Sequence, residues 1–319
     1  MSTTPLRLKE LSKKEELLTG GHRLCAGCGA PIAVRQVLLA AEMPIVAANA
    51  TGCLEVSTTI YPYSAWKIPW IHTAFENAAA TISGVEAMYR SLKKQGKIEE
   101  RIKFIAFGGD GGTYDIGFQS LSGAMERRHD IVYICYDNGA YMNTGIQRSS
   151  ATPFGANTTT SPAGEVIPGK LQPRKNLTKI MAAHGIPYVA QTTPAHWRDL
   201  MTKVRKALDV DGPAFINILA SCNRGWRTTT DRAIEDSRIA VDTCFWPLYE
   251  YEEGRLKINY KPKEKKPVVE FLKTQGRFKH LFSPENEDLL KQAQELVDQE
   301  WEALLREESL YTTDKDKEK

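Results

Sequence analysis

The sequence predicts an α/β protein with three layers and a mostly parallel sheet, because short apolar runs alternate with stretches of helical spacing. The runs have the length and β-branched content of buried strands, and they lie at residues 44–48, 102–107, 131–136, 214–219 and, more weakly, 187–190. The stretches of helical spacing between them cover residues 31–41, 74–94, 117–127, 176–184 and 195–208. The alternation stops after Trp246.

This pattern divides the chain into three segments. Residues 1–19 are a charged N-terminal arm, residues 20–245 are the α/β domain, and residues 246–319 are a C-terminal extension. Within the extension, residues 247–282 are expected to be extended and charged, and residues 284–308 have the spacing of a terminal helix. The extension is too thin to form its own core, so we expect it to wrap the domain or a partner subunit.

Composition and charge exclude several classes of protein. The formal net charge of +3 is too small to indicate a nucleic-acid partner. Residues 1–18 lack the apolar region of a signal peptide, and no stretch reaches the roughly 18 apolar residues of a membrane span. We therefore expect a cytoplasmic protein with no membrane partner. Thiols stay reduced or bind metals in that compartment.

Four of the six cysteines form an unusual pattern. Cys25 and Cys28 form a C-x-x-C among glycines, and Cys53 and Cys222 also lie beside small or loop-forming residues. Four such thiolates can hold an iron–sulfur cluster. Structural zinc is the alternative, but zinc sites usually pair two close doublets, and this chain has one. Cys135 lies inside an apolar run and is expected to be a packed thiol.

A second pattern predicts a magnesium site for a diphosphate. Strand 102–107 runs into Gly108-Gly109-Asp110-Gly111-Gly112, and strand 131–136 ends in Asp137-Asn138. Asp110 and Asn138 are 28 residues apart, about one βαβ unit, so neighbouring parallel strands would bring them about 4.8 Å apart. Ligands bind in the crevice at the carboxyl ends of such strands.

The residue types in this pattern suit the chemistry of magnesium and phosphate. Mg²⁺ takes one or two protein oxygens and completes its octahedron with phosphate and water. Asp110 would supply a carboxylate, Asn138 an amide oxygen, and the chain just beyond a backbone carbonyl. The glycines let backbone N–H groups approach a diphosphate at the start of a helix. A long polar loop follows at residues 152–173, and loops of this length are usually functional or disordered.

Gly109-Asp110-Gly111 followed by Asn138 resembles the thiamine diphosphate motif. With the four cysteines and Tyr141-Met142-Asn143-Thr144-Gly145, the chain resembles the β subunit of 2-oxoacid:ferredoxin oxidoreductases, of the pyruvate synthase and oxalate oxidoreductase type. The resemblance covers about residues 20–245. It implies the thiamine-diphosphate-binding fold, with thiamine diphosphate, Mg²⁺ and one [4Fe–4S] cluster as cofactors.

The resemblance also implies roles for individual residues. Asn143 is implied to be catalytic, near the thiazolium ring and the substrate. The implied cluster ligands are Cys25, Cys28, Cys53 and Cys222, and the implied magnesium ligands are Asp110, Asn138 and the carbonyl of Ala140. The remaining cofactor-binding positions are Thr51, Gly52, Phe75, Gly109, Gly111 and Gly112. Many relatives have a proline after the fourth cysteine, where this chain has Asn223-Arg224.

The activity implied by the resemblance is oxidative decarboxylation of a 2-oxoacid, with electrons passing through the cluster to ferredoxin. Pyruvate with coenzyme A is the default substrate pair, and oxalate without coenzyme A, 2-oxoglutarate and branched-chain oxoacids stay open. The resemblance places the activating glutamate on one partner subunit and further [4Fe–4S] clusters on another, so this chain would hold half of an active site.

Two other functions account for part of the sequence. A non-oxidative thiamine decarboxylase subunit would use Asp110 and Asn138 but would leave the four cysteines without a role. A zinc-stabilised, non-enzymatic assembly protein would use the cysteines but would leave the Asp110–Asn138 pairing without one.

Overall fold

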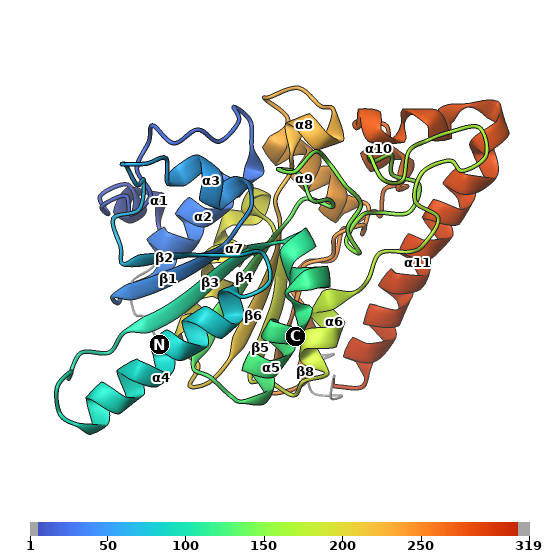
Figure 1. The fold of residues 1–319 in the computed structure, drawn as a ribbon. Coiled ribbons are helices and arrows are strands. Elements are labelled where there is room, and N and C mark those ends of the chain that lie inside the picture. The colour runs from blue at the N-terminus through green and yellow to red at the C-terminus, as the bar shows by residue number, and fades with distance from the viewer. Residues whose placement is uncertain (1–5, 312–319) are drawn as a thin grey trace.

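One sheet of eight strands forms the centre of the computed structural model, which describes residues 6–311 (Figure 1). The strand order is β2-β1-β3-β4-β6-β5-β7-β8; the first six strands are parallel, and the last two join antiparallel. The strands are β1 (Ile45–Ala50), β2 (Trp70–Thr73), β3 (Lys103–Gly109), β4 (Ile131–Asp137), β5 (Tyr188–Thr192), β6 (Ala214–Leu219), β7 (Tyr249–Glu252) and β8 (Arg255–Ile258). Residues 1–5 of the expected arm and residues 312–319 of the expected extension lie outside the described residues.

Helices cover both faces of this sheet, which confirms the three-layer α/β prediction (Figure 1). One face carries α2 (Gly29–Ala40) and α7 (Trp197–Asp209). The other carries α4 (Ala78–Lys94), α5 (Phe118–Glu126), α6 (Leu177–Ala182) and α11 (Glu287–Ser309). The remaining helices and helical turns are α1 (Leu8–Leu11), α3 (Cys53–Thr58), the π-helical turn η1 (Gly112–Ile116), η2 (Pro194–His196), α8 (Asn223–Trp226), α9 (Ala233–Asp242), α10 (Val269–Leu272), η3 (Gly276–Phe282) and η4 (Pro284–Asn286).

The two faces of the sheet form separate hydrophobic cores, because successive side chains of a strand point in opposite directions. On β3, Ile105 and Phe107 pack with α2 and α7, whereas Phe104 and Ala106 pack with α4 and α5. Every residue of β4 is buried. This burial on both sides explains why the central strands read as continuous apolar runs in the sequence.

The segment expected to be extended and charged, residues 247–282, is more structured than the sequence indicated. Strands β7 and β8 form a hairpin that adds to the sheet, with β7 pairing antiparallel to β5, so the sheet continues past residue 245. The hairpin turns at Glu253 and Gly254, which both have positive φ. Helix α10 and η3 then pack into a third hydrophobic cluster around Trp226 and Trp246. Most charged residues of this segment are exposed, but Glu250 and Arg277 are buried.

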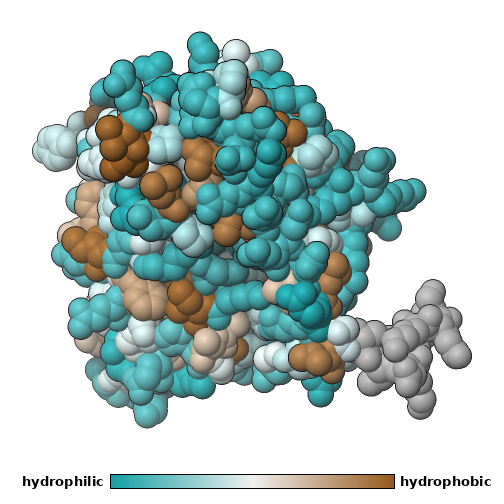
Figure 2. Space-filling view, turned by 90° about the vertical axis from the view of Figure 1, so that its right-hand side faces the viewer, coloured by the Kyte–Doolittle hydropathy of each residue, from teal (hydrophilic) through white to brown (hydrophobic). Residues whose placement is uncertain are grey.

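The terminal helix predicted over residues 284–308 is present as α11, preceded by η4. Its inner side chains Trp301 and Leu304 belong to the same core as α4, α5 and α6. The side of the molecule that lies at the right of Figure 1 is mostly hydrophilic, with scattered hydrophobic residues (Figure 2). Within residues 6–311, no helix is long and apolar enough to span a membrane.

Replacing Leu304 by alanine tests whether α11 is part of the folded domain. The side chain is fully buried, so Leu304→Ala is expected to lower the free energy of unfolding by about 2–5 kcal/mol. Urea denaturation followed by circular dichroism measures this change. The control is Glu302→Ala, which truncates an exposed side chain of the same helix and is expected to change stability by less than about 0.5 kcal/mol. Equal stabilities for the two variants would contradict the packing described here.

Candidate active site

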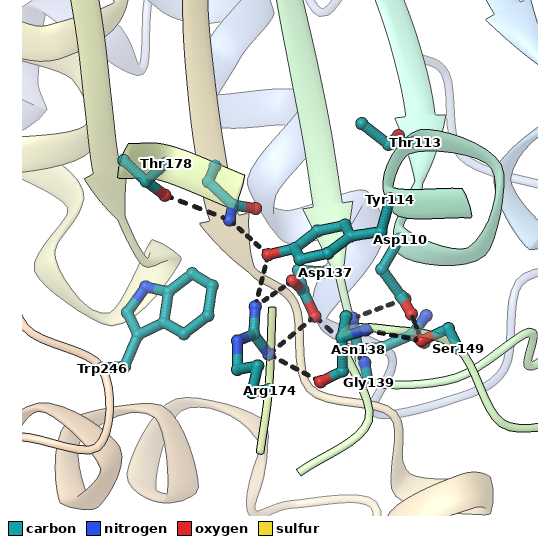
Figure 3. A network of polar contacts seen from close by, with 12 residues as sticks. Asp110, Thr113, Tyr114, Asp137, Asn138, Gly139, Ser149, Arg174, Thr178 and Trp246 are labelled. Atoms are coloured by element: carbon teal, nitrogen blue, oxygen red, sulfur yellow. Dashed lines mark hydrogen bonds and ion pairs between the residues drawn. The ribbon is translucent and has the colours of Figure 1, made fainter. Parts of the chain in front are cut away.

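The carboxyl ends of β3 and β4 bring Asp110 and Asn138 together, as the sequence predicted. The two strands are parallel neighbours, with Gly109 paired to Tyr136. Asp110 directly follows Gly109, and Asn138 comes two residues after Tyr136. Asp110 is fully buried, and its Oδ1 accepts a hydrogen bond from the backbone N–H of Asn138 at 3.2 Å. Its Oδ2 accepts from the hydroxyl of Ser149 at 2.5 Å (Figure 3). The carboxylate is therefore fixed in position by two separate segments.

Oxygen atoms converge beside Asp110 in a way that suits a divalent cation. The Asn138 amide is oriented with its oxygen toward two other oxygens, Asp110 Oδ1 and the carbonyl of Ala140. With the amide turned over, its nitrogen would donate to the same two atoms at 3.0 and 2.9 Å. Either a donor or a cation must occupy the space between these acceptors. A carboxylate, an amide oxygen and a backbone carbonyl are ligands that Mg²⁺ accepts, so the three residues fit the ion.

A second buried carboxylate, Asp137, lies next to this cluster of oxygens and pairs with Arg174 (Figure 3). The Arg174 guanidinium also donates to Tyr114 Oη at 2.6 Å and to the carbonyl of Ala151 at 3.0 Å, and it stacks on Trp246 with 4.6 Å to the ring centroid. Burial raises the pKa of Asp110 above its usual range, and the neighbouring charge of Asp137 is the second cause of this shift. A bound cation would offset both effects.

A narrow groove runs above Asp110 between the β1, β3 and β4 ends. The residues predicted to bind cofactor or substrate line it, together with Cys53 and the turn that follows β4: Thr51, Gly52, Phe75, Gly109, Gly111, Gly112, Asn138, Ala140, Tyr141, Met142, Asn143 and Thr144. The groove encloses about 20 Å³, room for about one water molecule. The Tyr141 ring packs edge-on against Phe75 at 6.0 Å, so a larger ligand requires Tyr141 to move.

Two glycines of the predicted motif are needed for close approach in this groove. A Cβ on Gly111 would lie 2.3 Å from the Tyr141 ring, and one on Gly112 would lie 2.8 Å from the Phe75 carbonyl. Gly112 also opens the π-helical turn η1, a helix type that is frequent at functional sites. The absence of side chains at these two positions lets the Tyr141 ring and the Phe75 backbone lie directly against the chain that follows β3.

The four cysteines expected to form a cluster site come from three separate parts of the chain. Cys28 precedes α2 as its N-cap, Cys53 begins α3, and Cys222 precedes α8 as its N-cap. The loop of Cys25 and Cys28 packs directly on the segment around Cys222. A Cβ on Gly27 would lie 2.1 Å from the Thr230 carbonyl oxygen, and one on Gly29 would lie 2.7 Å from Ser221 N. The backbone of the C-x-x-C is therefore held against residues 221–230.

The thiols of these cysteines influence one another. Burial, and next the charges of Cys222 and Cys25, raise the pKa of Cys28 to about 12. Burial also raises the pKa of Cys53 to about 12, with added contributions from Cys222, Cys28 and Cys25. All four are free thiols. A thiolate set of this kind suits a cluster of iron ions, whose positive charge offsets the cost of several buried negative charges.

In the part of the chain that the structure describes, no three His, Cys, Asp or Glu side chains are arranged to hold a single metal ion. The candidate magnesium site has only one side chain of these types, Asp110. Its other two ligands would be the amide oxygen of Asn138 and the backbone oxygen of Ala140.

Comparison with known proteins places the chain in a family. The profile of the thiamine pyrophosphate enzyme C-terminal TPP binding domain matches residues 50–218, which include the groove. The pyruvate synthase subunit PorB of Thermotoga maritima is 52% identical over 98% of this chain and 99% of that protein. The PorB subunit of Methanocaldococcus jannaschii is 57% identical over 87% of this chain and 94% of that protein. The chain belongs to the PorB family of 2-oxoacid:ferredoxin oxidoreductase subunits.

Two further similarities define the breadth of this family. The ketoisovalerate oxidoreductase subunit VorB of Pyrococcus furiosus is 46% identical over 91% of this chain and 93% of that protein. A solved 2-oxoglutarate:ferredoxin oxidoreductase from Magnetococcus marinus has 21% identity and a TM-score of 0.52, covering 67% of this chain and 76% of that chain. At that identity the solved structure supports the fold. The predicted fold class and the enzyme class are thus confirmed for this PorB-family chain.

Several residues around the PorB-family site were not predicted from the sequence. Ser149, Arg174 and Trp246 contact the two buried carboxylates or their partners, and none lies in a recognisable motif. Asp137 carried a weak signal, since it stands directly before Asn138 at the end of a strand. The long loop at residues 152–173 was a second weak signal, because it connects Ser149 to Arg174 and so returns the chain to the site.

Removing the Arg174 guanidinium tests how far the site depends on its pairing with Asp137. Arg174→Met leaves a buried carboxylate unpaired, so we expect the free energy of unfolding to fall by about 3–5 kcal/mol. Urea denaturation at pH 7 gives the value. The double variant Arg174→Met/Asp137→Asn removes both charges and is expected to recover part of the loss. A single variant within about 1 kcal/mol of the unmodified chain would show that Asp137 does not need this partner.

Proposed function

We propose that this PorB-family chain binds thiamine diphosphate, Mg²⁺ and one [4Fe–4S] cluster, and that it carries half of an active site that decarboxylates pyruvate oxidatively. The observation that supports this most directly is the shared position of Cys53. This residue lines the groove above Asp110, and its thiol also lies among the other cysteines. A donor of electrons bound in the groove would therefore be next to their acceptor.

Asp110, Asn138 and the carbonyl of Ala140 are proposed to hold the magnesium ion, and the backbone from Gly109 to Gly112 to hold the diphosphate. Ser149 keeps the Asp110 carboxylate oriented toward the cation, since its hydroxyl occupies the outer oxygen. Arg174 neutralises Asp137, so that the net charge left at the site is that of Asp110. When bound, thiamine diphosphate supplies the chemistry that breaks the bond between a keto carbon and its carboxylate.

Residues at the two rims of the groove are proposed to act on the substrate and the organic part of the cofactor. Thr51 and Gly52 lie on the rim that follows β1, and the Thr51 hydroxyl contacts His72 at 3.1 Å. Asn143 lies on the opposite rim, in the exposed turn that follows β4, and is proposed to be the catalytic residue of this chain. We infer that a partner subunit adds the activating glutamate. Glu86 of this chain is not a candidate for that role, because its carboxylate pairs with Arg90 and His129.

Pyruvate is proposed as the substrate, with coenzyme A as acyl acceptor, because the PorB relatives are subunits of pyruvate synthase. The 46% identity to a ketoisovalerate oxidoreductase subunit supports a branched-chain oxoacid as the second candidate. We infer that electrons leave the cluster toward further clusters on partner subunits and then to ferredoxin. A cytoplasmic location is proposed, because iron–sulfur ligands must stay reduced.

Two substitutions test the cofactor assignment in the complex purified anaerobically with its partner subunits. Cys222→Ala is expected to lower the iron and sulfide content by about four of each per complex. Asp110→Ala is expected to abolish magnesium-dependent binding of thiamine diphosphate. Iron, sulfide, zinc and thiamine analyses measure both. The matched controls are Cys244→Ala, a buried thiol outside the set, and Asp211→Ala, an exposed carboxylate, and neither is expected to change cofactor content.

Zinc in place of iron, or unchanged cofactor content in both site variants, would contradict the cofactor assignment. The first result would favour a zinc-stabilised protein, and the second would mean that the ligands lie elsewhere.

A panel of substrates tests the proposed specificity. The complex is expected to reduce ferredoxin at least tenfold faster with pyruvate and coenzyme A than with 2-oxoisovalerate, 2-oxoglutarate or oxalate. Ferredoxin reduction, followed by absorbance with and without coenzyme A, gives the rates. Faster turnover of 2-oxoisovalerate would assign the chain to the branched-chain group, and turnover of oxalate without coenzyme A would assign it to the oxalate group.

A further inference from the structure

The C-terminal segment places a charged side chain deep in the molecule, beside the cysteine site. Arg277 belongs to η3 and is 3% exposed. Its guanidinium lies over the ring of Trp226, with 4.6 Å to the ring centroid, and over Phe278 at 5.0 Å. Its Nε donates to Gln275 Oε1 at 2.9 Å, and its Nη1 donates to the Asn138 carbonyl at 3.4 Å. All of these partners are neutral.

Among residues 6–311, Arg277 forms no ion pair with a carboxylate. This sets it apart from Arg174, which neutralises Asp137 directly. A buried cation with neutral partners is costly, because hydrogen bonds to neutral groups replace only part of its hydration. A side chain in this state needs an anion nearby.

The ring of Trp226 connects Arg277 to the cysteine site. Trp226, on which Arg277 stacks, ends the four-residue helix α8 that Cys222 caps, and Trp226 N donates to the Cys222 carbonyl at 2.8 Å. Trp226 Nε1 and Arg277 Nη1 donate to the same oxygen, the carbonyl of Asn138.

We propose that Arg277 is the buried counter-ion of the iron–sulfur cluster and raises its reduction potential. This inference rests on the proposed function, in which the four cysteines hold a cluster. Four thiolates give such a cluster a net negative charge, and each added electron makes it more negative. A fixed cation in a dry environment therefore stabilises the reduced state more than the oxidised state. Arg277 acts as a positioning charge, without contacting the substrate.

The role differs from simple packing in one measurable way. A structural arginine would affect stability alone, whereas a counter-ion affects the potential of the cluster through its charge. Arg277→Met keeps much of the apolar stem and removes the charge, and Arg277→Lys keeps the charge but not the planar group. Arg238→Met removes an exposed charge from α9 and serves as the matched control.

The experiment is a redox titration of the full chain, loaded anaerobically with iron and sulfide and followed by electron paramagnetic resonance. Arg277→Met is expected to lower the equilibrium constant for one-electron reduction by about tenfold, which corresponds to about 59 mV. Arg277→Lys and Arg238→Met are expected to stay close to the unmodified chain. Far-UV circular dichroism and iron content are recorded for each variant.

The outcomes separate this inference from the proposed function. A loaded, folded Arg277→Met with an unchanged potential would overturn the counter-ion role and leave the cluster assignment intact. Absence of iron and sulfide from the unmodified chain, both alone and in the complex with its partner subunits, would overturn both proposals. Iron lost from Arg277→Met but kept by Arg277→Lys would support the role, and iron lost from both would overturn it. If Arg277→Met does not fold, Arg277→Gln gives the same comparison.

Discussion

Two carboxylates, Asp110 and Asp137, are buried side by side at the carboxyl ends of β3 and β4, and the surrounding structure has to neutralise them. Burial of one charge in a protein interior is costly, and two like charges repel each other strongly where the dielectric constant is low. Arg174 balances Asp137, with Trp246 behind it and Tyr114 beside it. Ser149 and the Asn138 backbone hold Asp110, whose charge the proposed cation would balance.

This requirement explains why the site draws on distant parts of the chain. The strand ends supply the carboxylates, but their neutralising partners come from the segments around residues 149 and 174 and from the region after residue 225. The third hydrophobic cluster contains Trp226, Trp246 and Phe271, and Arg174 stacks on its Trp246. The C-terminal extension is therefore part of the environment of the site, since Arg277 reaches the same carbonyl of Asn138 that Trp226 does.

The sequence was sufficient for the features that depend on local pattern and topology. Central strands buried on both faces read as apolar runs, and one βαβ unit with a direct crossover sets Asp110 against Asn138. Ser149, Arg174 and Arg277 were beyond reach, because their positions depend on how long loops fold back rather than on spacing. The β7–β8 hairpin was also missed, since charged residues interrupt its short strands, buried at Glu250 in β7 and exposed at Arg255 and Lys257 in β8. The cysteine ligand set came from a family resemblance, and it stays a prediction.

The two glycines of the C-x-x-C loop have a consequence for the order in which the protein is made. Gly27 and Gly29 are pressed against residues 221–230, so this side of the loop has nothing to pack on until that segment exists. Most of the α/β domain is synthesised between the first pair of cysteines and Cys222. The last wall of the cysteine site therefore emerges from the ribosome late, after the strands that carry Asp110 and Asn138.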